Sequence, residues 1–574
     1  MIHKNKSLSV RSNLPDYEKT YQEFSWEKAK AELIFFPDGT FNAAYNAIDR
    51  HAESDKKDKT ALIYESDKGE KESYTFAQLK EQTNKFANVL ASQGVEKGDR
   101  IFIFLPPTPE RYIAFLGILK TGAIAGTMFS AFQETALMDR LADSGAKIVV
   151  TNSELFSRIQ KIWKDLPDLQ KVILVDEGDF PEKEKLISYQ QEMTTASADF
   201  NVAHLKPDDF AYMLYTSGTT GKPKGVVHAH ADLLQAILTT KYVLDVKDQD
   251  IYWCTADIGW VTGVVYGVLG IWGLGGTSVV FGGRFSPEAW YKIIADNKVT
   301  VWYTAPTAIR MLMGSPVDPK QYDLSSLRHL CSVGEPLNPE GVMWGKETLG
   351  LPFHDTWWQT ETGSICITNY PSMDIKPGSM GKPFPGVVAG IVDDNGQELP
   401  AKQDGHLALK PETVYSLMKQ IWKNEEKYKS YFNNGWYISG DQAFKDEDGY
   451  FWFVGRADDV IKTSGERVGP FEVESTLIEH PSVLEAGVIG KPDELRGEII
   501  KAFVVLKQGV EPSDALKEEM AAFVKGKLAG HAYPREVEFI DKLPKTRSGK
   551  IMRRILKARE MGQPIGDTST LEEY

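Results

Sequence analysis

Cysteine is scarce in this chain, which contains only Cys254, Cys331 and Cys366 among its 574 residues. The three are widely separated and form no C-x-x-C pair, so the sequence predicts neither a disulfide framework nor a zinc site. A lone cysteine inside an apolar run is usually a small buried side chain, and this interpretation is favoured over a nucleophilic role. Such cysteine usage fits a reducing compartment, and we expect a cytoplasmic protein.

Positive charge is also limited. Lysine and arginine number 66 against 80 aspartate and glutamate residues, which gives a net charge of −14. A general binder of nucleic acid or of anionic membranes needs a broad positive surface, so we expect neither as a partner. An anionic ligand must then be met by local clusters of lysine and arginine. Residues 1–19 contain no apolar segment of the kind that a secretory signal requires.

Long apolar runs are rare, and one needs an interpretation. Residues 261–283, VTGVVYGVLGIWGLGGTSVVFGG, are uncharged over a length that could span a membrane. The run nevertheless holds eight glycines, and Gly275-Gly276 separates a helix-like part from the strand-like TSVVF. We interpret it as a buried helix, turn and strand rather than as a membrane helix.

The chain is too long for one hydrophobic core and suggests about three or four folding units. Short apolar runs that are typical of strands alternate with helix-patterned stretches. The strand-like runs are residues 100–105, 147–151, 171–175, 299–303 and 327–333, and the helical stretches include 110–122 and 286–297. This alternation is typical of parallel sheets covered by helices on both faces.

Towards the C-terminus the pattern changes twice. From about residue 379 it becomes shorter and richer in turns, as in a small β-rich subdomain. After residue 457 it predicts short strands at 485–489 and 501–507, a helix at 513–528 and a strand at 537–540. The sequence therefore predicts an α/β fold. A large N-terminal domain (1–457) of parallel sheets and helices includes the β-rich subdomain (379–457), and a smaller α+β domain (458–574) follows it.

The stretch YTSGTTGKPKG at residues 215–225 has the composition of a phosphate-binding loop. It is not a Walker A motif, because two residues rather than four separate Gly218 from Gly221 and because Pro223 follows Lys222. The stretch follows a buried strand at 210–215. Its glycines leave backbone N–H groups accessible, and these groups can bind a polyphosphate together with the hydroxyls and lysines. A flexible polar turn is the alternative interpretation.

His228 and His230 form an H-x-H pair shortly after this stretch. Metal sites need further ligands, and no third ligand lies near the pair in the sequence. We therefore favour local packing or hydrogen bonding over a metal site.

Several motifs follow in a fixed order along the chain. They are DTWWQTET at 355–362, YISGD at 437–441, GRADD at 455–459 and PKTRSGK at 544–550. Together with residues 215–225 they resemble the motifs of the adenylate-forming ligases. WCTADIGWVTG at 253–263, SVGEPLN at 332–338 and EVES at 472–475 narrow the resemblance to the acetyl-coenzyme A synthetases. The resemblance covers about residues 20–560.

The resemblance implies two half-reactions that use ATP, Mg²⁺ and coenzyme A. An acid, expected to be acetate, reacts with ATP to give acyl-AMP and pyrophosphate, and the acyl group then passes to coenzyme A with release of AMP. The alternatives are a propionyl or mixed short-chain acyl-CoA synthetase, a protein that loads a carrier-protein thiol, and a silent nucleotide sensor. The presence of Lys550, Asp441, Arg456 and Glu361 argues against the sensor.

Lys550 matches the catalytic lysine of these ligases. It lies in a basic cluster with Lys545, Arg547, Arg553 and Arg554, for which a solvated helix end is the alternative interpretation. Its ammonium would meet the negative charge that builds between carboxylate and α-phosphate. Because relatives are switched off by acylation of this lysine, the resemblance also implies a lysine acetyltransferase and a deacetylase as partners.

The resemblance assigns further polar residues to the nucleotide and its metal. Glu361 would bind the Mg²⁺ that bridges the phosphates, together with Thr219. Asp441 would accept hydrogen bonds from the ribose hydroxyls beside Arg456, although an aspartate that caps a turn is the alternative. The other predicted ATP or AMP contacts are Thr216, Ser217, Gly218, Thr219, Thr220, Gly221, Lys222, Gly334, Glu335, Pro336, Asp355, Thr356, Trp357, Gln359, Thr360 and Arg467.

Selecting acetate over longer acids requires a side chain that closes the pocket, which we call the wall. Each methylene adds about 0.8 kcal/mol of favourable burial, so an open apolar pocket would favour propionate or butyrate over acetate. By the resemblance Trp358 is that wall, and Val261, Thr262 and Val333 complete a pocket of the size of a methyl group.

The two half-reactions place different demands on one site, because Lys550 serves the first and the thiol of coenzyme A must enter for the second. Rotation of a mobile C-terminal domain about a hinge satisfies both demands. By the resemblance Asp458 is the hinge. Ser464, Gly465 and Glu466 would reach the thioester site after rotation, and Lys525 would bind the 3′-phosphate of coenzyme A.

Overall fold

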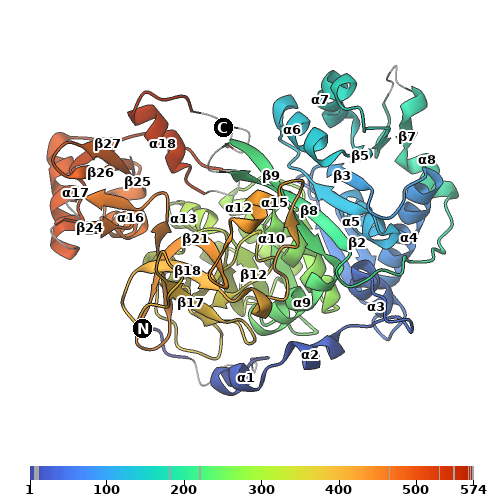
Figure 1. The fold of residues 1–574 in the computed structure, drawn as a ribbon, viewed down its shortest axis with the longest axis horizontal. Coiled ribbons are helices and arrows are strands. Elements are labelled where there is room, and N and C mark those ends of the chain that lie inside the picture. The colour runs from blue at the N-terminus through green and yellow to red at the C-terminus, as the bar shows by residue number, and fades with distance from the viewer. Residues whose placement is uncertain are drawn as a thin grey trace.

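The structure is a computed structural model that describes residues 1–4, 12–178, 180, 183–218, 221–463, 466–528, 531–546, 550–565, 568 and 571. Two large, mostly parallel sheets with their helices form the bulk of the chain, as Figure 1 shows. The C-terminal part, orange to red at the left of Figure 1, lies on the opposite side from the blue to teal helices α4, α6, α7 and α8. The predicted fold class is confirmed.

The first large sheet has eight strands. In spatial order they are β19 (Gln420–Ile421), β9 (Gly221–Ala229), β8 (Phe210–Gly218), β4 (Ile124–Thr127), β3 (Arg100–Phe104), β5 (Ile148–Thr151), β6 (Lys171–Leu174) and β7 (Leu186–Ser188). The strands from β8 to β7 are parallel, whereas β9 pairs antiparallel with both β8 and β19 at one edge. The parallel strands are covered on both faces, which is why their sequences are continuous apolar runs.

The second large sheet has nine strands. In spatial order they are β16 (Lys382–Pro383), β15 (Ile367–Thr368), β14 (Phe353–Trp357), β13 (His329–Ser332), β12 (Val301–Thr304), β10 (Ile251–Cys254), β11 (Thr277–Phe281), β1 (Thr60–Glu65) and β2 (Lys71–Thr75). The strands from β14 to β1 are parallel, and antiparallel strands complete both edges.

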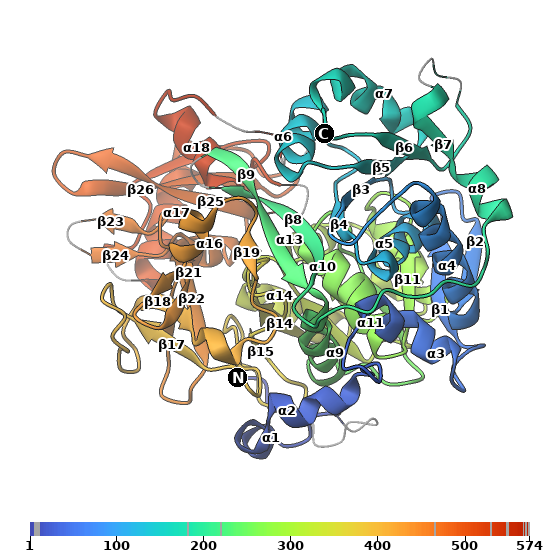
Figure 2. The same cartoon turned by 45° about the vertical axis from the view of Figure 1, so that its right-hand side comes forward.

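Helix α5 (Pro109–Thr121) lies between these two sheets, as Figure 2 shows. It is buried along almost its whole length, and Phe115 belongs to the same core as Ile101 of β3 and Leu62 of β1. A helix that is mostly apolar on all sides belongs in such a position, and its two buried cations, Arg111 and Lys120, each pair with an aspartate. The other main helices of this part are α1 (Tyr17–Glu23), α4 (Phe76–Ser92), α6 (Glu134–Ser144), α7 (Ser153–Ile162), α8 (Tyr189–Thr195), α9 (Leu233–Tyr242), α12 (Pro287–Asn297), α13 (Pro306–Met313), α14 (Pro339–Thr348) and α15 (Glu425–Lys429).

The uncharged run at residues 261–283 forms the predicted buried helix, turn and strand. It consists of α10 (Val261–Val264), a π-helical turn η6 (Val265–Leu269), α11 (Gly270–Gly273) and then β11. Across the part of the chain that the structure describes, every helix is too short or too polar to cross a membrane.

The turn-rich region forms a separate antiparallel sheet. Its strands are β17 (Ala389–Val392), β18 (Gly405–Leu409), β20 (Phe432–Asn433), β21 (Trp436–Lys445) and β22 (Phe451–Arg456). The register between β21 and β22 sets Asp441 opposite Arg456. Two residues that are distant in sequence thereby become neighbours.

The C-terminal part has its own sheet and its own hydrophobic core, which includes Ile461, Val473 and Val504. Its elements are β23 (Ile461–Thr463), β24 (Glu466–Val468), α16 (Pro470–Ile478), β25 (Val483–Asp493), β26 (Gly497–Leu506), α17 (Asp514–Lys527), β27 (Glu536–Phe539) and α18 (Arg553–Glu560). The short strands predicted at 485–489 and 501–507 were wrong in length. They are parts of one long hairpin, in which polar residues continue the pairing beyond the apolar runs.

Candidate active site

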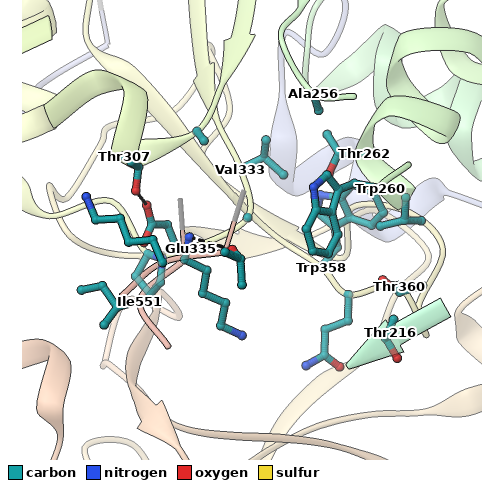
Figure 3. Close-up of a pocket in the computed structure, with 18 of the residues that line it drawn as sticks. Thr216, Ala256, Trp260, Thr262, Thr307, Val333, Glu335, Trp358, Thr360 and Ile551 are labelled. Atoms are coloured by element: carbon teal, nitrogen blue, oxygen red, sulfur yellow. Dashed lines mark hydrogen bonds between the residues drawn. The ribbon is translucent and has the colours of Figure 1, made fainter. Parts of the chain in front are cut away.

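A cleft of about 1150 Å³ lies between the large domain and the C-terminal part, and Figure 3 shows some of the residues that line it. Most of the residues predicted for the site line this cleft. They are Thr216, Val261, Thr262, Val333, Gly334, Glu335, Pro336, Asp355, Thr356, Trp357, Trp358, Gln359, Thr360, Glu361, Asp441, Arg456, Asp458 and Lys550.

The carboxyl ends of β13 and β14 form one wall, at the edge where parallel sheets commonly bind ligands. Asp355 on β14 accepts a hydrogen bond from Ser332 Oγ at 2.6 Å and one from the Leu337 backbone N–H at 3.4 Å. Burial raises the pKa of Asp355 to about 7, although the bond from Ser332 opposes this shift. Glu335, just beyond β13, pairs with Arg310 of α13 at 2.7 Å. This wall therefore holds two oriented carboxyl groups.

Asp441 lies at the junction of the β-rich sheet and β14. Its Oδ1 accepts from Arg456 Nη1 at 2.9 Å, and its Oδ2 accepts from Trp357 Nε1 at 2.9 Å. Gln359 Nε2 also lies 3.2 Å from Oδ2. Each carboxylate oxygen has more than one lone pair, so the fixed group can still accept hydrogen bonds from a ligand.

Glu361 lies in a polar cluster with Lys224 and Tyr431. Its Oε1 is 3.0 Å from Lys224 Nζ and accepts a hydrogen bond from the Tyr431 hydroxyl at 3.0 Å. Burial by itself would raise the pKa of this carboxyl, but the charge and the hydrogen bond of Lys224 hold it below the usual range. Glu361 is therefore kept as a carboxylate, the form that binds a cation.

The backbone around Glu361 is also fixed. His228 Nε2 lies 2.7 Å from the carbonyl oxygen of Thr360, and its Nδ1 lies 2.9 Å from Asp232. The Met418 N–H donates to the carbonyl oxygen of Glu361 at 2.8 Å. His230 Nδ1 accepts from the Ala43 N–H at 3.1 Å, so the predicted hydrogen-bonding role of both histidines is confirmed. Among the described residues, no group of three or more His, Cys, Asp or Glu side chains is arranged to hold a metal ion.

The motif at residues 215–225 turns from β8 into β9, and the two strands pair antiparallel. Thr216 contributes to the cleft, and its Oγ1 is buried without a hydrogen-bond partner among the described residues. Thr219 and Thr220 lie outside the described residues, and for Ser217, Gly218, Gly221 and Lys222 only the backbone is described. The orphaned Thr216 hydroxyl is a group that a polar ligand could satisfy.

The predicted acid pocket occupies one end of the cleft. Val261 and Thr262 come from α10, Val333 follows β13 and Trp358 follows β14. In Figure 3, Trp358 lies in the same part of the cleft as Thr262 and Trp260, away from Thr307 and Ile551. This end of the cleft is bounded mainly by apolar groups.

Lys550 comes from the C-terminal part, and its side chain is open to the cleft. Its backbone N–H bonds Thr546 Oγ1 at 3.1 Å, and its carbonyl accepts from the Thr546 N–H at 2.8 Å. The pKa of Lys550 is lowered, first because the surrounding protein displaces water and then because Arg456 and Arg553 are nearby cations. Lys550 therefore lines the same cleft as Asp441 and Glu361.

Some predicted residues are not brought to this cleft. Glu466 and Arg467 lie exposed on β24, and Lys525 lies near the end of α17, where its ammonium is 5.1 Å from the Tyr533 ring. Ser464 and Gly465 lie outside the described residues. In this arrangement of the chain Arg467 therefore does not line the cleft.

Several residues that support the site were not predicted from the sequence. Lys224 lies in a recognised motif but was not assigned a role, whereas Tyr431 and Arg310 lie in stretches without a motif. Tyr303, whose hydroxyl contacts both Thr356 and Trp358, lies in a run that predicts a buried strand and carries no other signal. All three cysteines are free and buried, as predicted, and burial raises the pKa of Cys254 to about 11.

Comparison with known proteins gives matches over almost the whole chain. The family model described as AMP-binding enzyme matches residues 48–422, and the model of the AMP-binding enzyme C-terminal domain matches residues 472–550. The chain is 57% identical to the acetyl-coenzyme A synthetase of Bacillus subtilis (strain 168), over 98% of each protein. It is 42% identical to the acetyl-coenzyme A synthetase of Methanothrix thermoacetophila, over 97% of this chain and 88% of that protein.

Solved structures give the same result. The anthranilate CoA ligase AuaEII in complex with anthranoyl-AMP matches with a TM-score of 0.84 and 32% identity, over 91% of this chain and 98% of that one. The Brucella canis acyl-CoA synthetase matches with a TM-score of 0.74 and 35% identity, over 96% and 100%. The chain therefore belongs to the AMP-binding enzyme family, and within it to the acetyl-coenzyme A synthetases.

Proposed function

We propose that the protein is an AMP-forming acetate:CoA ligase. The observation that carries the proposal is that Lys550, Asp441 and Glu361, from three distant parts of the chain, line one cleft whose far end is bounded by Trp358. A cation, two carboxylates and an apolar pocket are the groups that a nucleotide and a small acid require together.

In the first half-reaction, an acetate oxygen forms a bond to the α-phosphorus of ATP, and the bond from that phosphorus to pyrophosphate breaks. Such transfers depend on positioning and on neutralising charge. Lys550 stabilises the charge that develops between the carboxylate and the phosphate. Asp441, already oriented by Arg456 and Trp357, accepts hydrogen bonds from the ribose hydroxyls.

The residues present fit a Mg²⁺ ion that ATP brings with its phosphates. Mg²⁺ usually takes one or two protein carboxylates, phosphate oxygens and water, and Glu361 is a carboxylate of lowered pKa. The unpartnered hydroxyl of Thr216 lies in the same cleft, and we propose Thr219 as a further oxygen ligand. When bound, the ion neutralises phosphate charge, while Lys224 and Tyr431 keep the carboxylate in place.

In the second half-reaction, the thiol of coenzyme A loses its proton to water, its sulfur forms a bond to the acetyl carbon, and the bond from that carbon to the oxygen of AMP breaks. We propose that residues 458–574 rotate relative to residues 1–457 about Asp458. Ser464, Gly465, Glu466 and Arg467 would then replace Lys550 at the cleft, and Lys525 would contact the 3′-phosphate of coenzyme A. Supporting this, Lys557 contacts the Asp458 carbonyl at 3.3 Å, so the helix that follows Lys550 touches the proposed hinge.

The exposure of Lys550 also supports regulation by acylation. An enzyme that modifies lysine needs access to the ammonium, and acylation would remove the charge that the first half-reaction uses. We therefore propose a lysine acetyltransferase and a deacetylase as partners. We also propose a cytoplasmic location, which fits the three free cysteines.

The test is ATP–pyrophosphate exchange with acetate, propionate and butyrate, with and without coenzyme A, on the wild type and on Lys550→Ala. We expect exchange to be strongest with acetate and to collapse in Lys550→Ala, whereas the variant still converts added acetyl-AMP and coenzyme A to acetyl-CoA. Exchange with none of the three acids would overturn the proposed substrate. Acceptance of a carrier-protein thiol but not of free coenzyme A would favour a carrier-loading protein instead.

A further inference from the structure

The indole of Trp358 is held by two tyrosines that lie behind the wall of the cleft. Its Nε1 donates to the hydroxyl of Tyr303 at 3.3 Å. The ring of Tyr266 packs against the indole edge to face, with centroids 5.1 Å apart and planes at 82°. Both tyrosines are fully buried, so neither is positioned to contact a bound acid.

The hydrogen bonds behind Trp358 form a chain in which each group donates to the next, from the indole to Tyr303, Thr356 and the backbone of Ser332. Thr356 Oγ1 donates to the carbonyl oxygen of Ser332 at 2.8 Å, so its single proton is committed. The Tyr303 hydroxyl, 2.8 Å from Thr356 Oγ1, must therefore donate to Thr356 and accept from Trp358. The indole N–H is thus anchored through two hydroxyls to the backbone of β13, and its orientation is coupled to the sheet.

Tyr266 connects the wall to the opposite side of the pocket. It lies four residues after Thr262, on the same face of the helical segment formed by α10 and η6. Its hydroxyl accepts from the Ile365 N–H at 2.8 Å and lies 2.8 Å from Thr239 Oγ1. Its ring also packs at 89° against Tyr303. The segment that lines the pocket with Thr262 therefore also supports the indole.

We propose that Tyr303 and Tyr266 are positioning residues for acid selection, which hold the Trp358 indole across the pocket so that acids longer than acetate are excluded. The inference rests on the proposed function, in which Trp358 is the wall. A tryptophan of the same size that could change rotamer would move aside for a longer acid, so exclusion depends on the support as well as on the ring.

Two variants form a matched pair for the test. Tyr303→Phe and Tyr266→Phe each remove one buried hydroxyl that has two partners, but only Tyr303→Phe removes the bond to Trp358. Tyr266→Leu removes the ring that supports the indole. For each full-length variant, kcat/KM is measured with acetate, propionate and butyrate by coenzyme A-dependent release of AMP.

We expect the butyrate-to-acetate ratio of kcat/KM to rise about tenfold in Tyr303→Phe and Tyr266→Leu, the scale on which a pocket discriminates one or two methylenes. In Tyr266→Phe the ratio stays at the wild-type value. Melting temperatures are compared alongside, because a loss of stability shared by both phenylalanine variants cannot explain a ratio that changes in only one.

Trp358→Gly separates this inference from the proposed function. A ratio that rises in Trp358→Gly but not in Tyr303→Phe and Tyr266→Leu would overturn the positioning role and leave the wall intact. If the ratio is unchanged in Trp358→Gly, Trp358 is not the residue that excludes longer acids, and the positioning role of the two tyrosines is overturned with it. If the wild type activates none of the three acids, the proposed substrate fails before either question arises.

Discussion

The hydroxyl of Tyr431 donates a hydrogen bond to Oε1 of Glu361 over 3.0 Å, although the two residues are 70 positions apart in the chain. Lys224 lies 3.0 Å from the same oxygen and also donates to the Tyr431 hydroxyl. The Tyr431 ring stacks on Tyr437 at an interplanar angle of 12°. The proposed Mg²⁺ ligand is therefore oriented by a cation and by a phenol from separate segments.

Tyr431→Phe should keep the stacking but lose this orientation. A hydrogen bond to a charged group is worth about 1.5–3 kcal/mol, so we expect kcat/KM for MgATP to fall by about ten- to one-hundredfold. The Mg²⁺ concentration for half-maximal pyrophosphate exchange should also rise. Tyr428→Phe, which removes a hydroxyl that does not bond Glu361, is the control. An unchanged Mg²⁺ dependence in Tyr431→Phe would mean that Lys224 alone orients the carboxylate.

Gly363 follows Glu361 closely and has a φ of +73°. A Cβ at this position would lie 2.3 Å from the carbonyl oxygen of Ser416 and 2.9 Å from Cε1 of His228. Gly363→Ala should therefore lower both the melting temperature and pyrophosphate exchange. Gly39→Ala is the matched control, because Gly39 has a φ of +78° but no atom within 4 Å of the added carbon.

Gly39→Ala should show only the cost of a left-handed alanine, about 1–2 kcal/mol, and no loss of activity. Gly363→Ala adds a backbone clash and displaces the His228 contact to Thr360. Equal losses of stability in the two variants, with full activity in both, would contradict the claim that this loop is sterically fixed.

Asp355 predicts a pH dependence of stability. Its pKa is raised by burial from 3.8 to about 7, so the folded protein binds more protons than the unfolded chain between these values. The stability that this protonation contributes is full below about pH 4 and is lost as pH rises through about 7. Asp355→Asn, which can still accept from Ser332 Oγ, should have a flatter curve of melting temperature against pH. Parallel curves for variant and wild type across this range would contradict the raised pKa.

The elements that could be predicted from the sequence are those whose signal is local. β3, β5 and β6 are apolar runs because both faces of their sheet are covered. Helix α12 begins where Ser286 caps it and Pro287 occupies its first turn, a pattern visible in the sequence. The glycine pair at 275–276 marked the turn between helix and strand in the same way.

The remaining features depend on contacts between distant residues. The glycines, proline and lysines of residues 221–225 have little strand propensity, yet they extend β9 because β8 pairs with them. Tyr431 lies in a turn-rich stretch, and nothing near it in sequence indicates that its hydroxyl meets Glu361. Tyr303 resembles any buried strand residue until the fold places Trp358 beside it.

Arg111 is fully buried in α5 and forms two 2.6 Å hydrogen bonds with Asp257. Asp257 Oδ1 also accepts from the Gly259 N–H at 2.6 Å, which shapes the turn that leads to Thr262. Removing one partner of a buried ion pair can cost about 3–5 kcal/mol. The Asp257 side chain is 25% exposed, so water replaces part of the lost interaction and the cost should lie below that range.

Arg111→Met should therefore lower the melting temperature by several degrees and weaken acetate activation, because the turn before the acid pocket loses its anchor. In an Asp257→Asn background the same substitution should cost much less, since the charge that Arg111 neutralises is already gone. A double-mutant cycle on melting temperature measures this coupling. If the two single losses simply add, the pair is not coupled, and the turn at Asp257 must be held by its other bonds, from Gly259 N–H and through Thr127 to Ile258.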